Sequence, residues 1–214
     1  MRIDVWSDFV CPFCYIGKRL LEQAIEQLPE EEEIDVHYRS YQLDPDAQYD
    51  PGKTFTETFS ELKNIPAEQV IAMNRQISER AKEVGLDYNF DDMKYSNTFD
   101  AHRLFHYASE AGKAKEITER LFYAYFTESR LLSDRDTLLE LAEEVGLERE
   151  KVEQVLQSDQ YADEVNRDIR LAYQIGVRGV PFFVFNNKYA VSGAQPLEVF
   201  VEVLNKVLEE EKKE

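Results

Sequence analysis

Strand-like patterns occur only near the two ends of this chain. Near the N-terminus apolar and polar residues alternate in Arg2 to Trp6 and again in Ile34 to Leu43. Near the C-terminus strands are expected at Phe182 to Phe185 and Tyr189 to Val191, joined by a turn at Asn186-Asn187. The pattern therefore predicts two strands at each end, with none in the long stretch between them.

Most of the remaining chain has helical periodicity, with apolar residues three and four positions apart. Glycine, proline and capping residues divide it into separate helices. Ser133 is the expected cap of one helix, and a turn is expected at Pro51-Gly52. The predicted helices are Phe13 to Leu28, Pro66 to Val84, Phe99 to Ala111, Lys115 to Ser129, Asp134 to Val145, Glu150 to Gln157, Ser158 or Asp159 to Ile175, and Leu197 to about Leu208.

The resulting order is β-α-β, a helical block, then β-β-α. This order predicts an α/β fold whose chain is interrupted by a large all-helical insertion. The expected domains are residues 1–50 with 176–214, which form one discontinuous unit, and residues 51–175, which form the inserted domain.

Composition agrees with a compact protein and excludes several partners. Hydrophobic residues make up 43% of the 214 residues, which excludes wholesale disorder. The formal charge of −18 would repel nucleic acids and anionic membranes, and the acidic runs Glu30–Glu33 and Glu209–Glu211 are expected to be solvated turn and terminus. Because neither a signal peptide nor a long apolar run is evident, we expect a cytoplasmic protein without a membrane partner.

The two cysteines of the chain form a Cys11-Pro12-Phe13-Cys14 motif between a predicted strand and a predicted helix. Residues three apart on a helix lie about 5–6 Å from each other, which is close enough for a disulfide. The start of a helix also favours an anion, so we expect a reactive thiolate at Cys11 and a more sheltered, resolving thiol at Cys14. The motif predicts a redox-active dithiol.

Two other roles for the cysteine pair are less favoured. A structural disulfide across so short a loop would add little stability. A Cys2His2 zinc site could use His102 and His106, but these histidines follow far later in the chain than in zinc fingers. We therefore expect no metal and no cofactor beyond the Cys11–Cys14 disulfide itself.

Gly179-Val180-Pro181 directly precedes the third predicted strand. Pro181 could simply be the first residue of that strand, with Gly179 relieving a tight loop. Alternatively, the Val180–Pro181 bond is cis, and the Val180 backbone turns toward Cys11 to bind an extended polypeptide. The CxxC unit upstream favours the second interpretation.

Three motifs together give a family resemblance: Trp6 to Gly17, Gly179 to Phe183, and Ser192 to Pro196. The chain resembles the FrnE-type branch of the DsbA-like thioredoxin superfamily, and Ser96 to Leu104 also resembles that branch. The resemblance implies a thioredoxin fold with a helical insertion. It also implies thiol–disulfide oxidoreductase or isomerase activity on protein disulfides or low-molecular-weight thiols, with glutathione as a candidate co-substrate.

Carried over by position, the resemblance makes Cys11 the nucleophile, Cys14 the resolving thiol and Pro181 the cis-proline. The expected substrate-binding residues are Pro12, Phe13, Val180, Pro181 and His102, the last as a wall of the active-site cleft. Phe13 departs from the branch, which often has tryptophan there, so the reduction potential is left open.

Two alternatives come from other functional classes. Kappa-class glutathione transferases and 2-hydroxychromene-2-carboxylate isomerases are similar in architecture but carry serine at the position of Cys11, and they bind glutathione. A redox-sensing or chaperone module, whose aromatic-rich insertion holds partners, is the non-enzyme alternative.

Overall fold

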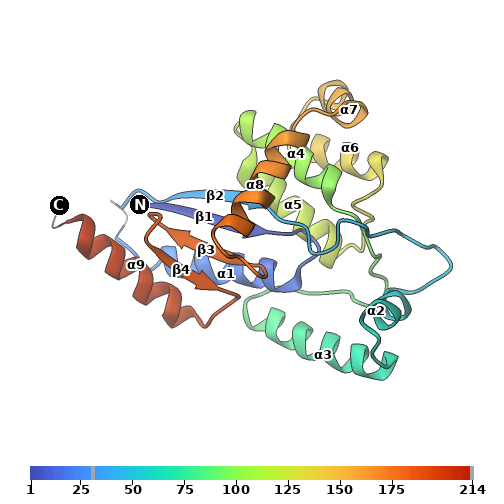
Figure 1. Cartoon of the computed structure of the whole chain (residues 1–214), viewed down its shortest axis with the longest axis horizontal. Helices are drawn as coiled ribbons and strands as arrows, with labels where there is room; N and C mark the ends of the chain where they lie inside the picture. Colours follow the sequence, from blue (N-terminus) through green and yellow to red (C-terminus); the bar gives the residue numbers. More distant parts are fainter. Residues whose placement is uncertain (30–31, 213–214) are drawn as a thin grey trace. The chain divides into compact units, whose positions relative to one another are not determined.

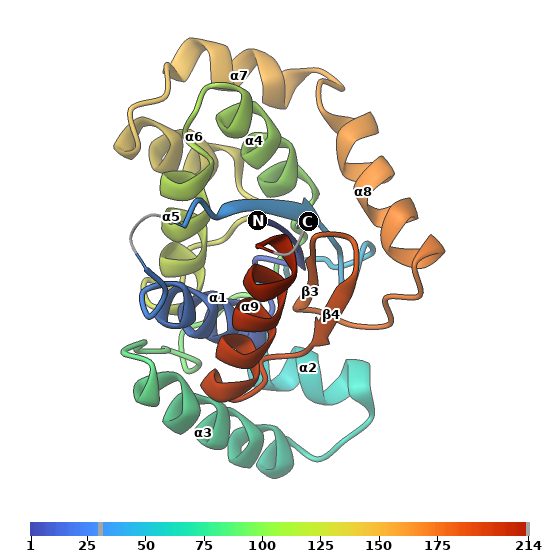
Figure 2. The same ribbon diagram turned by 90° about the vertical axis from the view of Figure 1, so that its left-hand side faces the viewer.

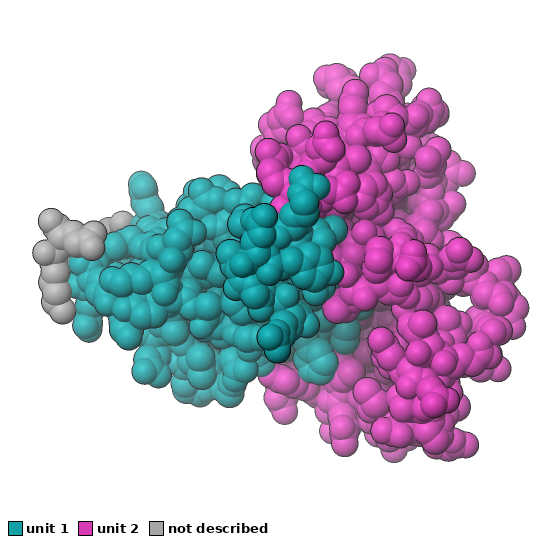
Figure 3. All heavy atoms as spheres, in the orientation of Figure 1, with its two compact units in different colours: residues 1–41, 168–214 teal, residues 42–167 magenta. Residues whose placement is uncertain are grey.

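The computed structural model describes residues 1–29 and 32–212 and divides into two compact units (Figure 3). Unit 1 is Met1–Tyr41 with Asp168–Glu214, and unit 2 is Gln42–Arg167. These units divide at 41/42 and 167/168, whereas the sequence placed domain boundaries at 50/51 and 175/176. Glu30 and Glu31, part of the acidic run expected to be solvated, lie outside the described residues.

Unit 1 contains a four-stranded sheet with the order β2-β1-β3-β4 (Figure 1). Its strands are β1 (Arg2–Ser7), β2 (Asp35–Ser40), β3 (Phe182–Phe185) and β4 (Tyr189–Ser192). β1 pairs parallel with β2 and antiparallel with β3, and β3 pairs antiparallel with β4. A parallel pair needs a crossover, and α1 (Pro12–Ile25) provides it. The predicted β-α-β and β-β-α segments are confirmed.

One face of this sheet packs on two helices, α1 and α9 (Leu197–Glu211), which lie side by side (Figure 2). Val5 pairs with Phe183 in the register of β1 and β3, so both side chains point to this face. The ring of Phe183 meets that of Phe200 edge to face, with centroids 4.9 Å apart, and both are fully buried. This face holds the apolar core of the unit.

The other face of the sheet is held by the part of α8 (Ala162–Gln174) that belongs to unit 1. The Trp6 indole Nε1 donates a hydrogen bond to the Asp168 carbonyl at 3.0 Å. Arg39 forms ion pairs with Asp4 at 2.8 Å and with Asp168 at 3.2 Å. Burial raises the pKa of Asp4, but hydrogen bonds from Arg2 and Arg39 outweigh it and hold this pKa below its ordinary value. A buried tryptophan and a partly buried charge network therefore fix α8 to the sheet.

Unit 2 consists of helices. They are α2 (Phe55–Lys63), α3 (Ala67–Glu83), α4 (Phe99–Glu110), α5 (Ala114–Phe126), α6 (Arg135–Glu144), α7 (Arg149–Gln157) and the start of α8. α4 contacts α5, α6 and α7, and α2 contacts α3. The predicted all-helical character of this block is confirmed. Across both described ranges, no helix is long and apolar enough to cross a membrane.

The largest difference from the prediction in unit 2 is α2, which the sequence pattern did not indicate. None of the residues of this helix is buried, and its apolar stripe is too short to indicate a helix in the sequence. Thr54 and Glu57 form a capping box at its start.

Several helix ends also differ from the prediction, and α1 and α5 end at Ile25 and Phe126, three residues earlier than expected. α6 is capped by Asp134 and not by Ser133, because the Asp134 carboxylate accepts a hydrogen bond from the Thr137 N–H at 2.9 Å. α8 starts only at Ala162, since Tyr161 has a left-handed backbone with φ 63°. α9 continues through Glu211, so the acidic run near the C-terminus forms its last turn.

Candidate functional site

Cys11 lies at the start of α1, in the N-cap position. Its backbone is extended, with φ −88° and ψ 113°, and Pro12 follows in the first turn of the helix. The Cys11 N–H donates to the Asp8 carbonyl at 3.0 Å, and the Cys14 N–H donates to the Cys11 carbonyl at 3.0 Å. A sulfur in this position faces the positive end of the helix dipole, which stabilises an anion.

Cys14 lies one turn further along α1 and is 2% exposed. Burial raises the pKa of its thiol well above the ordinary value, and contact with the Cys11 side chain raises it further. The Ser7 hydroxyl and the Asp8 backbone act in the opposite direction, because they hydrogen-bond the thiolate form. The two cysteines are not joined by a disulfide in this structure. Cys14 therefore keeps its proton while Cys11 occupies the position that favours an anion.

The loop before β3 reaches the first cysteine. The Cys11 thiol donates to the Val180 carbonyl, with 3.5 Å between sulfur and oxygen. The Val180–Pro181 peptide bond is cis. The Pro181 carbonyl accepts a hydrogen bond from the Gly193 N–H at 2.8 Å, which continues the pairing of β3 with β4. The Val180 backbone therefore turns toward Cys11, as the second interpretation of the Gly179-Val180-Pro181 segment expected.

Gly17 is a site residue that the sequence analysis missed. A Cβ at this position would stand 3.0 Å from Pro181 Cγ and 3.0 Å from Phe183 Cζ, closer than real Cβ atoms normally come to other atoms. The absence of a side chain lets the proline ring approach α1. A glycine in the interior of a predicted helix is the sequence signal that could have indicated this close approach.

Tyr41 lies near Asp8 in the turn before Cys11, and Tyr173 of α8 lies beside Tyr41. Burial raises the pKa of Tyr41, and Tyr173 and the Asp8 carboxylate raise it further. The rings of Tyr41 and Tyr173 have centroids 6.2 Å apart. Asp8 itself is 1% exposed, and its carbonyl closes the turn between β1 and α1. A buried carboxylate and an aromatic pair therefore lie next to the turn that precedes Cys11 in unit 1.

The predicted site residues Cys11, Pro12, Phe13, Cys14, Val180 and Pro181 all belong to unit 1. His102 lies in α4 of unit 2, where it is 2% exposed and its N–H donates to the Thr98 carbonyl at 2.9 Å. Its assignment to the wall of the cleft stays a prediction. Among residues 1–29 and 32–212, no group of three or more His, Cys, Asp or Glu side chains is placed to hold a metal ion.

Comparisons with known proteins agree with this geometry. The family model described as "DSBA-like thioredoxin domain" matches residues 2–205. A protein of Bacillus subtilis (strain 168), the uncharacterized protein YwbO, is 30% identical over 209 aligned residues, and the alignment covers 96% of each chain.

Two solved structures extend the comparison. The probable DsbA oxidoreductase SCO1869 from Streptomyces coelicolor is 37% identical, with a TM-score of 0.92 over 98% of this chain and 91% of that one. A 2-hydroxychromene-2-carboxylate isomerase has a TM-score of 0.74 at 15% identity, over 100% of this chain and 98% of that one, and it shares the fold alone.

Proposed function

The chain belongs to the DsbA-like thioredoxin domain family, and from this premise we propose that it is a thiol–disulfide oxidoreductase or isomerase. Cys11 and Cys14 are its redox pair. The observation that carries the proposal is the asymmetry of the two thiols. Cys11 stands at the start of α1 against the Val180 carbonyl, whereas Cys14 is buried and its pKa is raised well above the ordinary value.

The proposed reaction proceeds in two exchanges. The Cys11 thiolate attacks a substrate disulfide, forms a mixed disulfide and releases the first substrate sulfur as a thiolate, which takes up a proton. Cys14 then attacks the Cys11 sulfur, loses its proton and releases the second substrate thiol. Two substrate thiols and a Cys11–Cys14 disulfide result. The reverse sequence oxidises a dithiol, and escape before the second exchange allows isomerisation.

Residues around the dithiol have separate roles in this proposal. Val180 offers its backbone to an extended substrate, and Pro181 closes the site opposite α1. Pro12 and Phe13 are the parts of the motif that a bound substrate would touch. Ser7 and the Asp8 backbone assist the second exchange, because they favour the thiolate form of Cys14.

The glutathione-binding alternative is less well supported. Structural likeness to the 2-hydroxychromene-2-carboxylate isomerase concerns the fold alone. Cys14 contacts the Cys11 side chain, so it would attack a glutathione adduct on Cys11 and release the glutathione. We therefore assign glutathione the role of co-substrate, and we propose protein disulfides or small thiols as partners and no further cofactor.

We also propose that the protein is cytoplasmic. Cysteines in that compartment are usually reduced, catalytic or metal-bound. A pair in a redox motif, without other cysteines in the sequence, fits the catalytic case.

A glutathione redox titration tests the proposed function. The protein is equilibrated at fixed ratios of reduced to oxidised glutathione, and free thiols are counted by mass while Trp6 fluorescence is followed. A two-electron transition is expected. A midpoint of about −270 mV indicates a reductant, and a midpoint of about −120 mV indicates an oxidant. Isomerases have midpoints between these two values.

Two variants complete the test. Cys11→Ser should abolish exchange, and Cys14→Ser should accumulate mixed disulfides because resolution is lost. Circular dichroism and thermal melts verify that both variants fold. Full exchange activity in folded Cys11→Ser, or a stable glutathione adduct in the wild type without Cys11–Cys14 disulfide formation, would contradict the proposal.

A further inference from the structure

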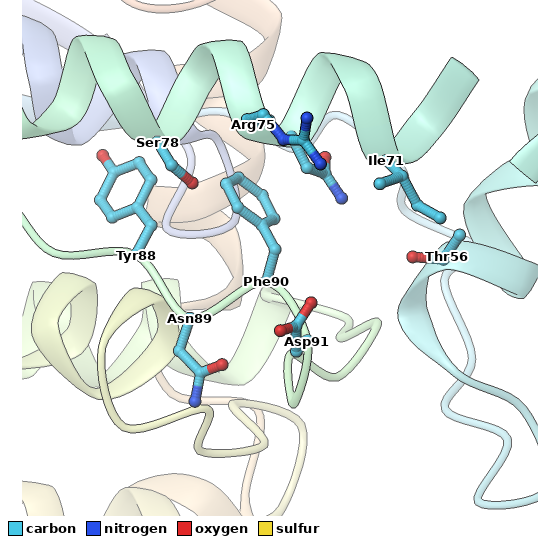
Figure 4. A pocket seen from close by; sticks show the side chains of 9 residues that line it. Thr56, Ile71, Arg75, Ser78, Tyr88, Asn89, Phe90 and Asp91 are labelled. Carbon is cyan, nitrogen blue, oxygen red and sulfur yellow. The ribbon is translucent and has the colours of Figure 1, made fainter. Parts of the chain in front are cut away.

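Unit 2 contains a cavity of about 280 Å³ beside α3 (Figure 4). α3 contributes Ile71, Asn74, Arg75 and Ser78 to its lining. These residues are three and four positions apart, so they lie on one side of the helix. Thr56 of α2 and residues 88–91, which follow α3, complete the lining. The cavity therefore belongs entirely to the helical unit, whereas the dithiol belongs to unit 1.

Tyr88 and Phe90 form an aromatic wall of this cavity. They are only 7% and 8% exposed, and their rings meet edge to face with centroids 5.8 Å apart. The Tyr88 ring also stacks on Phe126 of α5, with centroids 4.5 Å apart. Between the two aromatic residues, the Asn89 N–H donates to the Phe126 carbonyl at 2.7 Å. The Asn89 side-chain amide donates to Asp92 at 3.0 Å. Contacts within the protein therefore hold this wall in place.

Opposite charges reach toward the same space in this cavity. Arg75 extends into it from α3, and Asp91 extends into it from the segment after α3 (Figure 4). Phe90 borders this space on one side, and Ile71, which is 50% exposed, borders it on the other. Within the part of the chain that the structure describes, neither Arg75 nor Asp91 forms a hydrogen bond or an ion pair. Both charges can therefore pair with a ligand.

Neutral polar groups stand beside these charges. Asn74 and Ser78 are half-buried, and their side chains make no hydrogen bond to any other group in residues 1–29 and 32–212. Half-buried amides and hydroxyls of this kind are satisfied by water or by a ligand. A polar ligand that replaces such water keeps those hydrogen bonds.

The combination of groups restricts the class of ligand. A simple anion would pair with Arg75 but would be repelled by Asp91, and a simple cation would meet the opposite difficulty. A molecule that carries both charges satisfies both residues. Pockets of about 300–1,000 Å³ accept drug-sized ligands, so this cavity fits a smaller molecule. Its aromatic wall favours a ligand with a ring, because ring pairs add stability beyond the burial of apolar area.

We propose that this cavity binds a free α-amino acid with an aromatic side chain. The ligand carboxylate accepts hydrogen bonds from the Arg75 guanidinium, and the ligand ammonium donates to the Asp91 carboxylate. The ligand ring packs between Phe90 and Ile71. This inference goes beyond the proposed function, because none of these residues takes part in disulfide exchange.

L-Phenylalanine and three analogues test the inference, with binding to the wild-type protein measured by saturation-transfer NMR. Phenylpropionate lacks the ammonium group, phenylalaninamide lacks the carboxylate, and glycine lacks the ring. We expect saturable binding of phenylalanine and about tenfold weaker binding of each analogue, because each loses one charged hydrogen bond or the buried ring. Equal affinity for all four compounds, or no saturable binding of phenylalanine at millimolar concentration, would overturn the inference.

Two variants that each remove one charge locate the site. Arg75→Gln should weaken the binding of phenylalanine about tenfold but leave that of phenylalaninamide unchanged, because the amide has no carboxylate to lose. Asp91→Asn should weaken phenylalanine and leave phenylpropionate unchanged for the corresponding reason. Both residues are exposed, so both variants should melt at the wild-type Tm. Arg170→Gln is the matched control, since Arg170 is an exposed arginine of α8 in unit 1, and it should change neither affinity.

The outcomes keep this inference apart from the proposed function. Arg75→Gln should exchange disulfides with oxidised glutathione at the wild-type rate. An equal effect of Arg75→Gln on phenylalanine and phenylalaninamide, or an equal effect of Arg75→Gln and Arg170→Gln, contradicts the site even while exchange continues. S-Methylglutathione also carries a free α-amino acid group. If it binds more tightly than phenylalanine and Arg75→Gln abolishes that binding, the aromatic ligand class is wrong.

Discussion

Replacing Gly17 by alanine tests how closely the Pro181 loop packs on α1. The new methyl group would stand 3.0 Å from Pro181 Cγ and from Phe183 Cζ. Phe183 is fully buried against Phe200, so its ring cannot move away without disturbing the core. Pro181 follows Val180, whose carbonyl contacts Cys11, so displacement of the proline ring reaches the redox site.

The magnitude follows from two opposing effects. Forcing a methyl group into a packed core costs about 1–3 kcal/mol, and two contacts with rigid rings place Gly17→Ala at about 2–3 kcal/mol. Alanine in a helix recovers about 0.5–1 kcal/mol relative to glycine. The net loss is about 1–2.5 kcal/mol, which lowers Tm by roughly 2–10 °C in a protein of this size.

Thermal melts of the reduced protein, followed by circular dichroism, measure this loss. Gly179→Ala is the matched control, because no atom lies within 4 Å of its added Cβ. Its Tm should stay the same or rise slightly, since alanine restricts the unfolded chain. A Tm for Gly17→Ala at or above that of the wild type would refute the argument that Pro181 and Phe183 require a glycine there.

Two further predictions concern charge. Because the pKa of Cys14 is raised in the folded protein, the folded protein keeps a proton that the unfolded chain releases above about pH 8.5. The free energy of unfolding of the reduced protein should therefore fall above that pH, by up to about 1.4 kcal/mol per pH unit. Urea unfolding between pH 7 and 10 should show a shallower decline for Cys14→Ala, and equal slopes would contradict the prediction. Asp168→Ala removes the acceptor of the Ser40 N–H and a partner of Arg39, so it should cost about 2–3 kcal/mol in urea unfolding. The exposed Asp159→Ala should change stability by less than about 0.5 kcal/mol, and equal losses would show that the Asp168 contacts do not stabilise the fold.

The positions of the strands along the chain and of most helices were predictable from the sequence because periodicity and capping act between near neighbours, whereas the order of the strands in the sheet was not predicted. Alternation marked β1 and β2, and a Gly or Pro stood at many helix ends. α2 was missed because its apolar stripe is short and none of its residues is buried. The position of Cys11 at the start of α1 was also predictable, since a strand, a CxxC motif and a helix follow one another directly.

Only the tertiary structure decided which distant residues meet. Val180 is 169 positions from Cys11, and Asp168 is 162 positions from Trp6. The close approach of Pro181 to Gly17 depends on how β3 packs against α1. The raised pKa of Cys14 depends on burial by the whole unit, which no local pattern encodes. The sequence by itself determined the chemistry available at the dithiol, whereas folding determined its surroundings, because desolvation and long-range contacts arise only when separate segments pack together.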